Sequence, residues 1–409
     1  MSHSLTTMRR FVLSYACCTA RNSNALQVTK RFIQSDQSQA PFIEVPNTFH
    51  AKDLEHTPTK EPKSKTPNEK LVFGKQFTDH MLEVEWEESK GWGKPRIVPY
   101  HNLSLAPSCS ALHYAIQCFE GMKAYTNGKE EFLFRPDMNA KRLNRSCSRL
   151  GLPTFNEEEF VKAIAKLVNV EREWIPKERG YSLYIRPTVI STEETLGVLP
   201  PKKALLYVIM SPVGPYFKTG FAAVKLLADP RYVRAFPGGT GHVKLGANYG
   251  PTILPQIEAA KKGYSQVLWL FGENHEISEV GTMNIFFYIT NEKGEEELVT
   301  APLNDTVLPG VTRDTIINIT KNEWGMNVSE RVFTMKDLNL CIVENRIHEA
   351  FGAGTACVVS PVKAISFKDE EFAIPVPEKG LAVKLVNHIL GIQYGDIESP
   401  YRVKINDLL

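Results

Sequence analysis

A lysine surrounded by glycines is the first feature of this sequence that could carry out chemistry. Residues 238–251 read GGTGHVKLGANYGP, where Lys244 stands among five glycines and a tyrosine, with no acidic residue. A lysine is a nucleophile only as the neutral amine, so it works best where desolvation lowers its pKa. A surface lysine in a flexible glycine loop is the alternative for this segment alone. A Walker A nucleotide site is excluded, because Val243 rather than glycine precedes Lys244.

A carboxylate further along the chain could complement this amine. Glu279 opens the run EVGTMNIFFYIT, whose apolar residues predict a buried strand. An isolated carboxylate at such a place usually marks a solvated strand end. In a pyridoxal enzyme, a carboxylate instead keeps the ring nitrogen protonated, so that the ring can withdraw electrons from the substrate's α-carbon.

Three features could hold a phosphate group. The segment LPGVTRD at 308–314 is a glycine turn that leads into a helix, and GAGTA at 352–356 is a second turn of small residues. Thr312 and Thr355 add hydroxyl donors, and Arg142 could add positive charge, although an arginine on a helix is more often solvated. An amine, a carboxylate and a phosphate cradle are the groups that pyridoxal phosphate needs.

Aromatic residues and one arginine could form a substrate pocket. The segment HYAIQCFEGMKAY places Tyr114 and Phe119 ahead of a strand, and YIRP places Tyr184 and Arg186 on another. An arginine in an apolar strand needs an anionic partner if it points inward, and its planar fork suits a carboxylate. An outward-facing arginine on a half-buried strand is the alternative.

Composition restricts the class of protein. The chain has 409 residues, enough for two domains, and a net charge of +2 provides no general field for nucleic acid or an anionic membrane. No apolar run approaches the roughly 20 residues that span a bilayer. Only five of the seven cysteines follow residue 35, without C-x-x-C or Cys/His spacing, so we expect reduced thiols and no metal site.

The N-terminal segment has the composition of a mitochondrial transit peptide. Residues 1–35 contain five basic residues and no Asp or Glu. A secretory signal and a tail without an address are the competing interpretations. Residues 36–67, rich in proline and lysine, predict a disordered linker. The sequence does not fix the cleavage site or decide whether a cytosolic form is also made.

The remaining chain predicts a mixed α/β fold, of α+β type, in two domains. We place a small α+β domain at 68–217 and a large cofactor-binding domain at 218–409, with the site in the cleft between them. We expect a helix over 156–174, capped by Asn156 and Glu159, with Phe160, Ile164, Leu167 and Val168 on its apolar face. Further helices are expected near 251–262, 311–322 and 379–393. Strands are expected at 119–125, 131–136, 181–190, 204–213, 266–270, 284–290 and 297–302.

Taken together, these segments resemble the branched-chain amino acid aminotransferases, pyridoxal-phosphate enzymes of fold type IV. The resemblance runs from LVFGKQFTDHM at 71 to the C-terminal region. It rests on HYAIQCFEGMKAY, SLYIRP, VKLGANYGP, EVGTMN, LPGVTRD and GTACVVSP in this order. It implies reversible, ping-pong transfer of the amino group of Leu, Ile or Val to 2-oxoglutarate, and a homodimer as the working unit.

The resemblance also implies roles for individual residues. Lys244 would bind pyridoxal 5′-phosphate covalently and shuttle the proton. Glu279 would contact the pyridine nitrogen, Tyr249 the 3-oxygen and Thr282 the ring. The phosphate would be held by Arg142, Val311, Thr312 and Thr355. The substrate would be bound by Tyr114, Phe119, Tyr184 and Tyr216 around its side chain, by Thr355 and Ala356 at its α-carboxylate, by Arg186 at the distal carboxylate of glutamate, and by Val198 of the partner subunit.

One departure and several alternatives remain. Mammalian mitochondrial members of the family carry C-x-x-C where this chain has Cys357 and Ser360, so a disulfide switch is not expected there. The alternatives are a D-amino acid aminotransferase, an aminodeoxychorismate lyase, or a binding protein that kept an inactive enzyme fold. The sequence does not rank Leu, Ile and Val.

Overall fold

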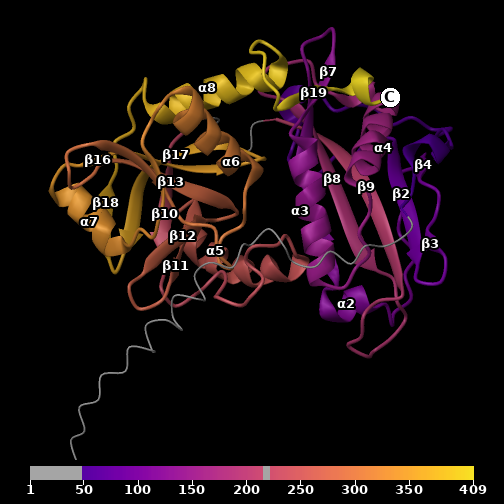
Figure 1. Ribbon diagram of the computed structural model, residues 1–409, viewed down its shortest axis with the longest axis horizontal. Coiled ribbons are helices and arrows are strands. Elements are labelled where there is room, and N and C mark those ends of the chain that lie inside the picture. The colour runs from indigo at the N-terminus through magenta and orange to yellow at the C-terminus, as the bar shows by residue number, and fades with distance from the viewer. Residues whose placement is uncertain (1–47, 215–221) are drawn as a thin grey trace, which may run out of the picture. The chain divides into compact units, whose positions relative to one another are not determined.

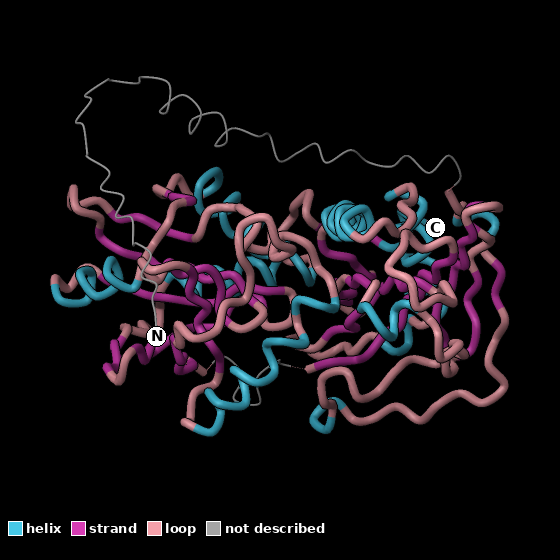
Figure 2. Tube along the Cα trace, turned by 90° about the horizontal axis from the view of Figure 1, so that it is seen from below, coloured by secondary structure: helices cyan, strands magenta, loops and turns pink. Residues whose placement is uncertain are grey.

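The computed structural model describes residues 48–214 and 222–409, which form two halves built on two separate β-sheets (Figure 1). Seen from below, the strands gather in two groups, one in each half (Figure 2). The predicted leader at 1–35, the predicted boundary at 217/218 and Tyr216 lie outside the described residues. Within the described ranges, no helix is long and apolar enough to cross a membrane, and no acidic, His or Cys side chains cluster as metal ligands would.

The first half contains a ten-stranded sheet in the order β1-β4-β2-β9-β8-β6-β7-β19, with β3 paired to β2 and β5 to β8. Its strands are β1 (Glu55–His56), β2 (His80–Glu87), β3 (Gly91–Trp92), β4 (Arg96–Pro99), β5 (Gln117–Phe119), β6 (Met122–Thr126), β7 (Glu131–Phe134), β8 (Ser182–Ser191), β9 (Lys203–Val213) and β19 (Arg402–Lys404). Its helices are η1 (Ala51–Asp53), η2 (Asn68–Lys70), α2 (Ser110–Tyr114), α3 (Pro136–Arg149), α4 (Glu157–Val170), η3 (Arg172–Trp174) and η7 (Ile405–Leu408), where η marks 3₁₀ turns.

The second half contains a nine-stranded sheet in the order β12-β11-β10-β17-β16-β13-β14-β15, with β18 paired to β17. Because β12 also pairs with β13, six of these strands close into a ring. The strands are β10 (Val224–Ala228), β11 (Gln266–Phe271), β12 (Glu276–Val280), β13 (Met283–Thr290), β14 (Glu296–Thr300), β15 (Val328–Glu330), β16 (Ile347–Gly354), β17 (Val358–Phe367) and β18 (Glu370–Ala373). The helices are η4 (Gly246–Asn248), η5 (Gly250–Thr252), α5 (Ile253–Lys261), α6 (Val311–Asn318) with its π-helical continuation η6 (Ile319–Glu323), α7 (Met335–Val343) and α8 (Leu381–Tyr394).

Helix α4 confirms the Asn156 part of the predicted cap, whereas the Glu159 side chain accepts the N–H of Ala51 rather than that of Asn156. The Asn156 side chain accepts the backbone N–H of Glu159 at 3.0 Å. The four residues predicted for its apolar face are all 0% exposed and pack in the core of the first half. Local sequence therefore set both the start and the orientation of this helix.

Apolar packing and the chain terminus join the two halves. Tyr125 and Phe134 of the first sheet share a buried cluster with Phe286, Phe351 and side chains of α8. After α8 the chain returns to the first sheet as β19, so the predicted 218–409 domain does not contain its own C-terminus (Figure 1). The two halves are therefore connected by α8, β19 and this apolar cluster.

Two predicted elements differ from the structure. The linker prediction is wrong from residue 48 onward, because Phe49 is 2% exposed against Trp92 and Phe155, and the N–H of Ala51 donates to Glu159. The predicted strand over 119–125 is interrupted after Phe119, where the Glu120 side chain binds the guanidinium of Arg142 on α3.

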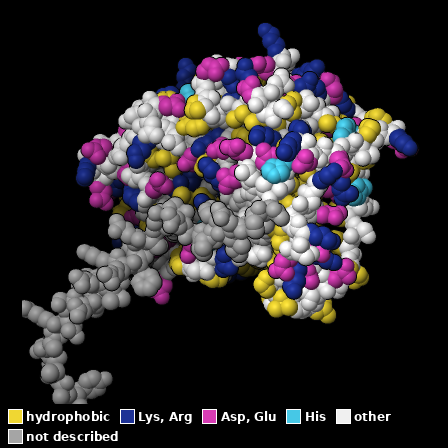
Figure 3. Space-filling model, turned by 45° about the vertical axis from the view of Figure 1, so that its right-hand side comes forward, with side chains coloured by type: hydrophobic (Ala, Val, Ile, Leu, Met, Phe, Trp, Pro, Cys, Tyr) yellow, Lys and Arg dark blue, Asp and Glu magenta, His cyan; other side chains and the backbone are white. Residues whose placement is uncertain are grey.

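The surface carries charges of both signs. Lys and Arg side chains are interspersed with Asp and Glu over the face shown in Figure 3. This pattern agrees with the net charge of +2 and gives that face no single-sign field.

Candidate active site

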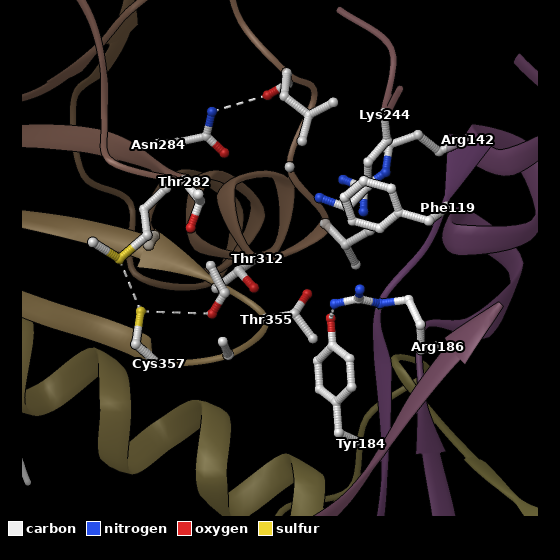
Figure 4. A pocket seen from close by; sticks show the side chains of 18 of the residues that line it. Phe119, Arg142, Tyr184, Arg186, Lys244, Thr282, Asn284, Thr312, Thr355 and Cys357 are labelled. Carbon is white, nitrogen blue, oxygen red and sulfur yellow. Dashed lines mark hydrogen bonds between the residues drawn. The ribbon is translucent and has the colours of Figure 1, made fainter. Parts of the chain in front are cut away.

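A cavity of about 310 Å³ is lined by residues of both halves. It brings together eleven of the residues predicted for the site: Phe119, Arg142, Tyr184, Arg186, Lys244, Tyr249, Thr282, Val311, Thr312, Thr355 and Ala356. Figure 4 shows Phe119, Arg142, Tyr184 and Arg186 facing the threonines of the second half across this space.

Lys244 is fixed by contacts with the first half. Its backbone N–H donates to Ser146 Oγ at 2.9 Å, and its carbonyl accepts the N–H of Phe119 at 3.1 Å. Its Nζ donates to Tyr249 Oη at 2.9 Å and lies 4.8 Å from the centre of the Phe119 ring. No ion pair joins Lys244 to a carboxylate within 48–214 and 222–409, so the amine faces aromatic rings and a phenol.

Arg142 is held by a buried ion pair. Its Nε and Nη2 donate to the two oxygens of Glu120 at 2.6 and 2.8 Å, and Nη1 donates to the carbonyl of Pro309 at 3.0 Å. Burial alone would raise the pKa of Glu120, but the charge and hydrogen bonds of Arg142 outweigh it and hold that pKa below its ordinary value. The contact with Pro309 places the guanidinium beside the turn that opens α6.

Arg186 has looser surroundings. It donates through Nη2 to Tyr184 Oη at 3.1 Å and lies 4.7 Å from the centre of the Phe119 ring, while its buried Nε has no hydrogen-bond partner in the described part of the chain. Gly121 permits this arrangement, since an added Cβ would come 2.0 Å from Tyr184 Oη. The cavity therefore contains a guanidinium that still has a donor to offer.

Glu279 lies behind the cavity lining rather than in it, on β12. It is 2% exposed, pairs with Arg234 Nε at 2.8 Å and accepts the N–H of Leu308 at 2.6 Å. Burial raises the pKa of Glu279, although Arg234, Leu308 and the nearby Lys244 act in the opposite direction. Its proposed contact with a pyridine nitrogen stays a prediction.

Two backbone turns form the second-half wall. Gly310 precedes α6, and an added Cβ there would lie 2.1 Å from Asn284 Oδ1, so this close approach requires glycine. Thr355 and Ala356 lie in the turn between β16 and β17, followed by Cys357. Burial raises the pKa of Cys357 to about 12, so its thiol is protonated at neutral pH. The five cysteines in the described residues are free.

Two predicted substrate residues lie away from this cavity. Tyr114 is 39% exposed and its hydroxyl donates to the carbonyl of Leu196, while Val198 is 76% exposed. Neither lines the cavity of its own chain. The hydrogen bond between Tyr114 and Leu196 joins α2 to the loop that follows β8 at the surface.

Several residues that shape the site were not predicted from the sequence. Glu120 and Arg234 are the buried ion-pair partners of Arg142 and Glu279, and Phe73 and Met283 line the cavity. Glu120 carries a local signal, because it interrupts an apolar strand directly after Phe119. Arg234 carries none, since its partner is 45 residues away along the chain.

Comparison with known proteins places this geometry in a family. Residues 117–365 match the model of amino-transferase class IV, a class that depends on pyridoxal phosphate. The chain is 52% identical over 369 residues to a branched-chain-amino-acid aminotransferase of Dictyostelium discoideum, covering 88% of this chain and 97% of that protein. It is 49% identical over 382 residues to the cytosolic protein of that name from Mus musculus, covering 91% and 99%. The mitochondrial protein from Bos taurus is 50% identical over 355 residues, covering 85% and 90%.

Solved structures agree with the fold. The branched-chain aminotransferase from Thermoproteus uzoniensis, solved with norvaline, matches with a TM-score of 0.65 at 25% identity, over 79% of this chain and 99% of that chain. The enzyme from Thermobaculum terrenum in its PLP form matches with a TM-score of 0.63 at 21% identity, over 80% and 98%. The predicted type IV fold is thereby confirmed.

Proposed function

Because the chain belongs to the class IV aminotransferases and, within them, to the branched-chain-amino-acid aminotransferases, we propose that it transfers the amino group of Leu, Ile or Val to 2-oxoglutarate, reversibly and by a ping-pong mechanism. The observation that carries this proposal is the position of Lys244 Nζ in a cavity with two arginines in different states of pairing. One arginine suits a permanent anion, and the other suits an anion that arrives and leaves.

The residues around the cavity fit pyridoxal 5′-phosphate. Lys244 offers the amine for covalent attachment, and Arg142, Thr312, Thr355 and the N–H of Val311 offer donors to a phosphate at the start of α6. Glu279, Thr282 and Tyr249 would contact the ring. When bound, this cofactor withdraws electrons from the substrate's α-carbon.

Lys244 performs the proton transfer in this proposal. Its Nζ takes the α-proton of the bound amino acid, and Tyr249 Oη at 2.9 Å fixes the direction of the amine. The Phe119 ring lies 4.8 Å from Nζ, where it would limit the access of water to the amine.

The same pocket accepts apolar and acidic side chains. The rings of Phe119 and Tyr184 contact the branched methyl groups of Leu, Ile or Val, and Arg186 receives the distal carboxylate of glutamate. Thr355 and Ala356 bind the α-carboxylate that all these substrates share.

A donor panel with 2-oxoglutarate as acceptor tests the proposal. We expect Leu, Ile and Val to be donors, and we expect Lys244→Ala to abolish transfer together with the visible absorbance of the holoenzyme. Transfer from D-amino acids instead would favour a D-amino acid aminotransferase. Absence of both transfer and visible absorbance in the wild type would favour the inactive binding protein.

We further propose that the working unit is a homodimer in which Val198 enters the partner's cavity. The exposed apolar residues of α2 and of the loop between β8 and β9 support this arrangement, since large apolar patches on soluble proteins usually mark contacts. These residues are Leu112, Tyr114, Leu196, Val198 and Leu199.

Mixed dimers test a role in trans. A Lys244→Ala protomer and a Val198→Asp protomer are each expected to be inactive alone. Combined, they regain activity at the one site with an intact Lys244 and an intact Val198 from the other chain. If the mixture stays inactive while dimers form, Val198 does not act across the interface.

We propose a mitochondrial location on the composition of residues 1–35. Curated relatives include cytosolic and mitochondrial proteins. Fusion of residues 1–35 to a fluorescent protein should direct it to mitochondria, and a diffuse cytosolic signal would contradict this.

A further inference from the structure

Lys123 on β6 is a buried amine that the proposed mechanism does not use. It is 6% exposed, and among the described residues it is the one lysine that is buried. Its neighbours Met122 and Ala124 point into the core of the first half. Since successive strand side chains alternate between faces, Lys123 points the other way, toward the second half.

The amine bridges the two halves by binding Ala356, a residue that lines the cavity. Lys123 Nζ donates to the carbonyl of Ala356 at 2.8 Å, between residues that are 233 positions apart. Within 48–214 and 222–409, no carboxylate pairs with it at ion-pair distance. A buried ammonium without an anionic partner is unfavourable, so its presence calls for a compensating charge.

The turn that Lys123 contacts is strained. Thr355, Ala356 and Cys357 line the cavity, and the next residue, Val358, has φ of 64°. A β-branched residue in this left-handed region is costly and persists only when its surroundings hold it. Because the peptide is planar and trans, fixing the Ala356 carbonyl also fixes the N–H of Cys357 in the opposite direction. The lysine therefore orients the backbone of this turn.

The charge balance of the cavity leaves one group uncompensated. Glu120 neutralises Arg142, and Arg186 is assigned to the distal carboxylate that only glutamate carries. The α-carboxylate of every substrate would otherwise meet only neutral donors at Thr355 and Ala356. Lys123 is a cation that donates a hydrogen bond directly to this turn.

We propose that Lys123 is a positioning residue for the substrate's α-carboxylate: it holds the Thr355–Cys357 turn and supplies the positive charge that balances this carboxylate. The inference rests on the proposed function and adds to it a specific subsite for the shared carboxylate. Lys123 thus complements Arg186, which serves only the distal carboxylate.

The titration of Lys123 supports this assignment. Burial lowers the pKa of Lys123 to about 8, and the facing Cys357 thiol acts in the opposite direction. Tyr184, a further titratable residue, is its register partner on β8. Carboxylate binding should therefore weaken as the pH rises through about 8, because the ammonium loses its proton.

Two analogues of the leucine skeleton separate charge from shape. The holoenzyme is titrated with 4-methylpentanoate and with the neutral 4-methylpentanamide, and binding is followed by visible absorbance and calorimetry. We expect the wild type to prefer the carboxylate, and Lys123→Met to lose about tenfold of that preference, or about 1.4 kcal/mol. The amide should bind both proteins alike. Lys363→Met, at an exposed lysine on β17, is the matched control and should behave as the wild type.

Two further measurements keep the test decisive if Lys123→Met does not fold. Lys123→Arg should retain the preference for the carboxylate. In the wild type, the ratio of the affinity for the carboxylate to that for the amide should fall above about pH 8. The neutral amide serves as the reference, because other titrating groups affect the binding of both analogues. A Lys123→Met protein with the wild-type preference, or a ratio independent of pH between 7 and 9, would overturn the proposal. If the wild type did not transfer the amino group of Leu, Ile or Val to 2-oxoglutarate, the proposed function itself would be overturned instead.

Discussion

Arg142 and Arg186 reach the same cavity from the same half of the molecule, but their surroundings differ. Arg142 has a bidentate carboxylate partner in Glu120 and a third contact at Pro309. Arg186 has a single neutral partner, Tyr184, and an Nε without one. A paired arginine is fixed before any ligand arrives, whereas an unpaired one gains its partner from the ligand. The cavity thus separates a permanent anion site from an exchangeable one.

The largest expected effect comes from removing the carboxylate partner of Arg142. Glu120→Ala leaves the guanidinium of Arg142 buried without its counter-ion, which costs about 3–5 kcal/mol of the free energy of unfolding. Urea denaturation of the apoprotein measures this loss. Glu120→Gln keeps the shape and should fall between Glu120→Ala and the wild type. A Glu120→Ala protein as stable as the wild type would show that the pair does not fix Arg142.

The next largest effect is expected at Arg186, the arginine without a charged partner. Arg186→Ala should lower kcat/KM for glutamate about a hundredfold, because a buried carboxylate then lacks a partner. The kcat/KM for leucine should change less than about threefold, since leucine has no distal charge. Steady-state kinetics with both donors measure the ratio. Equal losses for both donors would remove the distinction between the two arginines.

A smaller effect is expected from the neutral partner of Arg186. Tyr184→Phe removes the hydroxyl that accepts from Arg186 and keeps the aromatic ring. Glutamate turnover should fall by about two- to tenfold, the range of one hydrogen bond of 0.5–1.5 kcal/mol. Leucine turnover should be unchanged. A larger loss for leucine than for glutamate would assign Tyr184 to the apolar wall alone.

The smallest effect is a change in the free energy of unfolding that is expected only at acidic pH. The pKa of Glu120 is below its ordinary value of 4.5 in the folded protein, so its pair contributes stability above that value and loses it as the pH falls further. The difference in unfolding free energy between the wild type and Glu120→Gln should therefore be constant above about pH 5 and shrink below about pH 4.5. Denaturation at several pH values measures it. A constant difference down to pH 3 would contradict the assignment.

The sequence predicted elements where local pattern and packing agree. The cap at Asn156 and the apolar face of α4 are local features, and both are present. The glycine-flanked Lys244 and the turns at Gly310 and Thr355 were found because unusual residue types stand close together along the chain. The prediction of a disordered linker was wrong for residues 48–67, since the buried Phe49 and Ala51 anchor a segment that is otherwise mostly polar.

The sequence by itself determined which residue types are available for the site, namely an amine, aromatic rings and small-residue turns, in the order typical of one family. Only the tertiary structure decided which charges are already compensated. Arg142, Arg186 and Lys123 look alike in a sequence, but their partners differ. The fold of the first half brings Glu120 to Arg142, and Tyr184 stands two residues before Arg186 on the same strand. Only Lys123 receives its partner, Ala356, through the packing of the two halves. Whether a buried charge binds a ligand depends on that pairing.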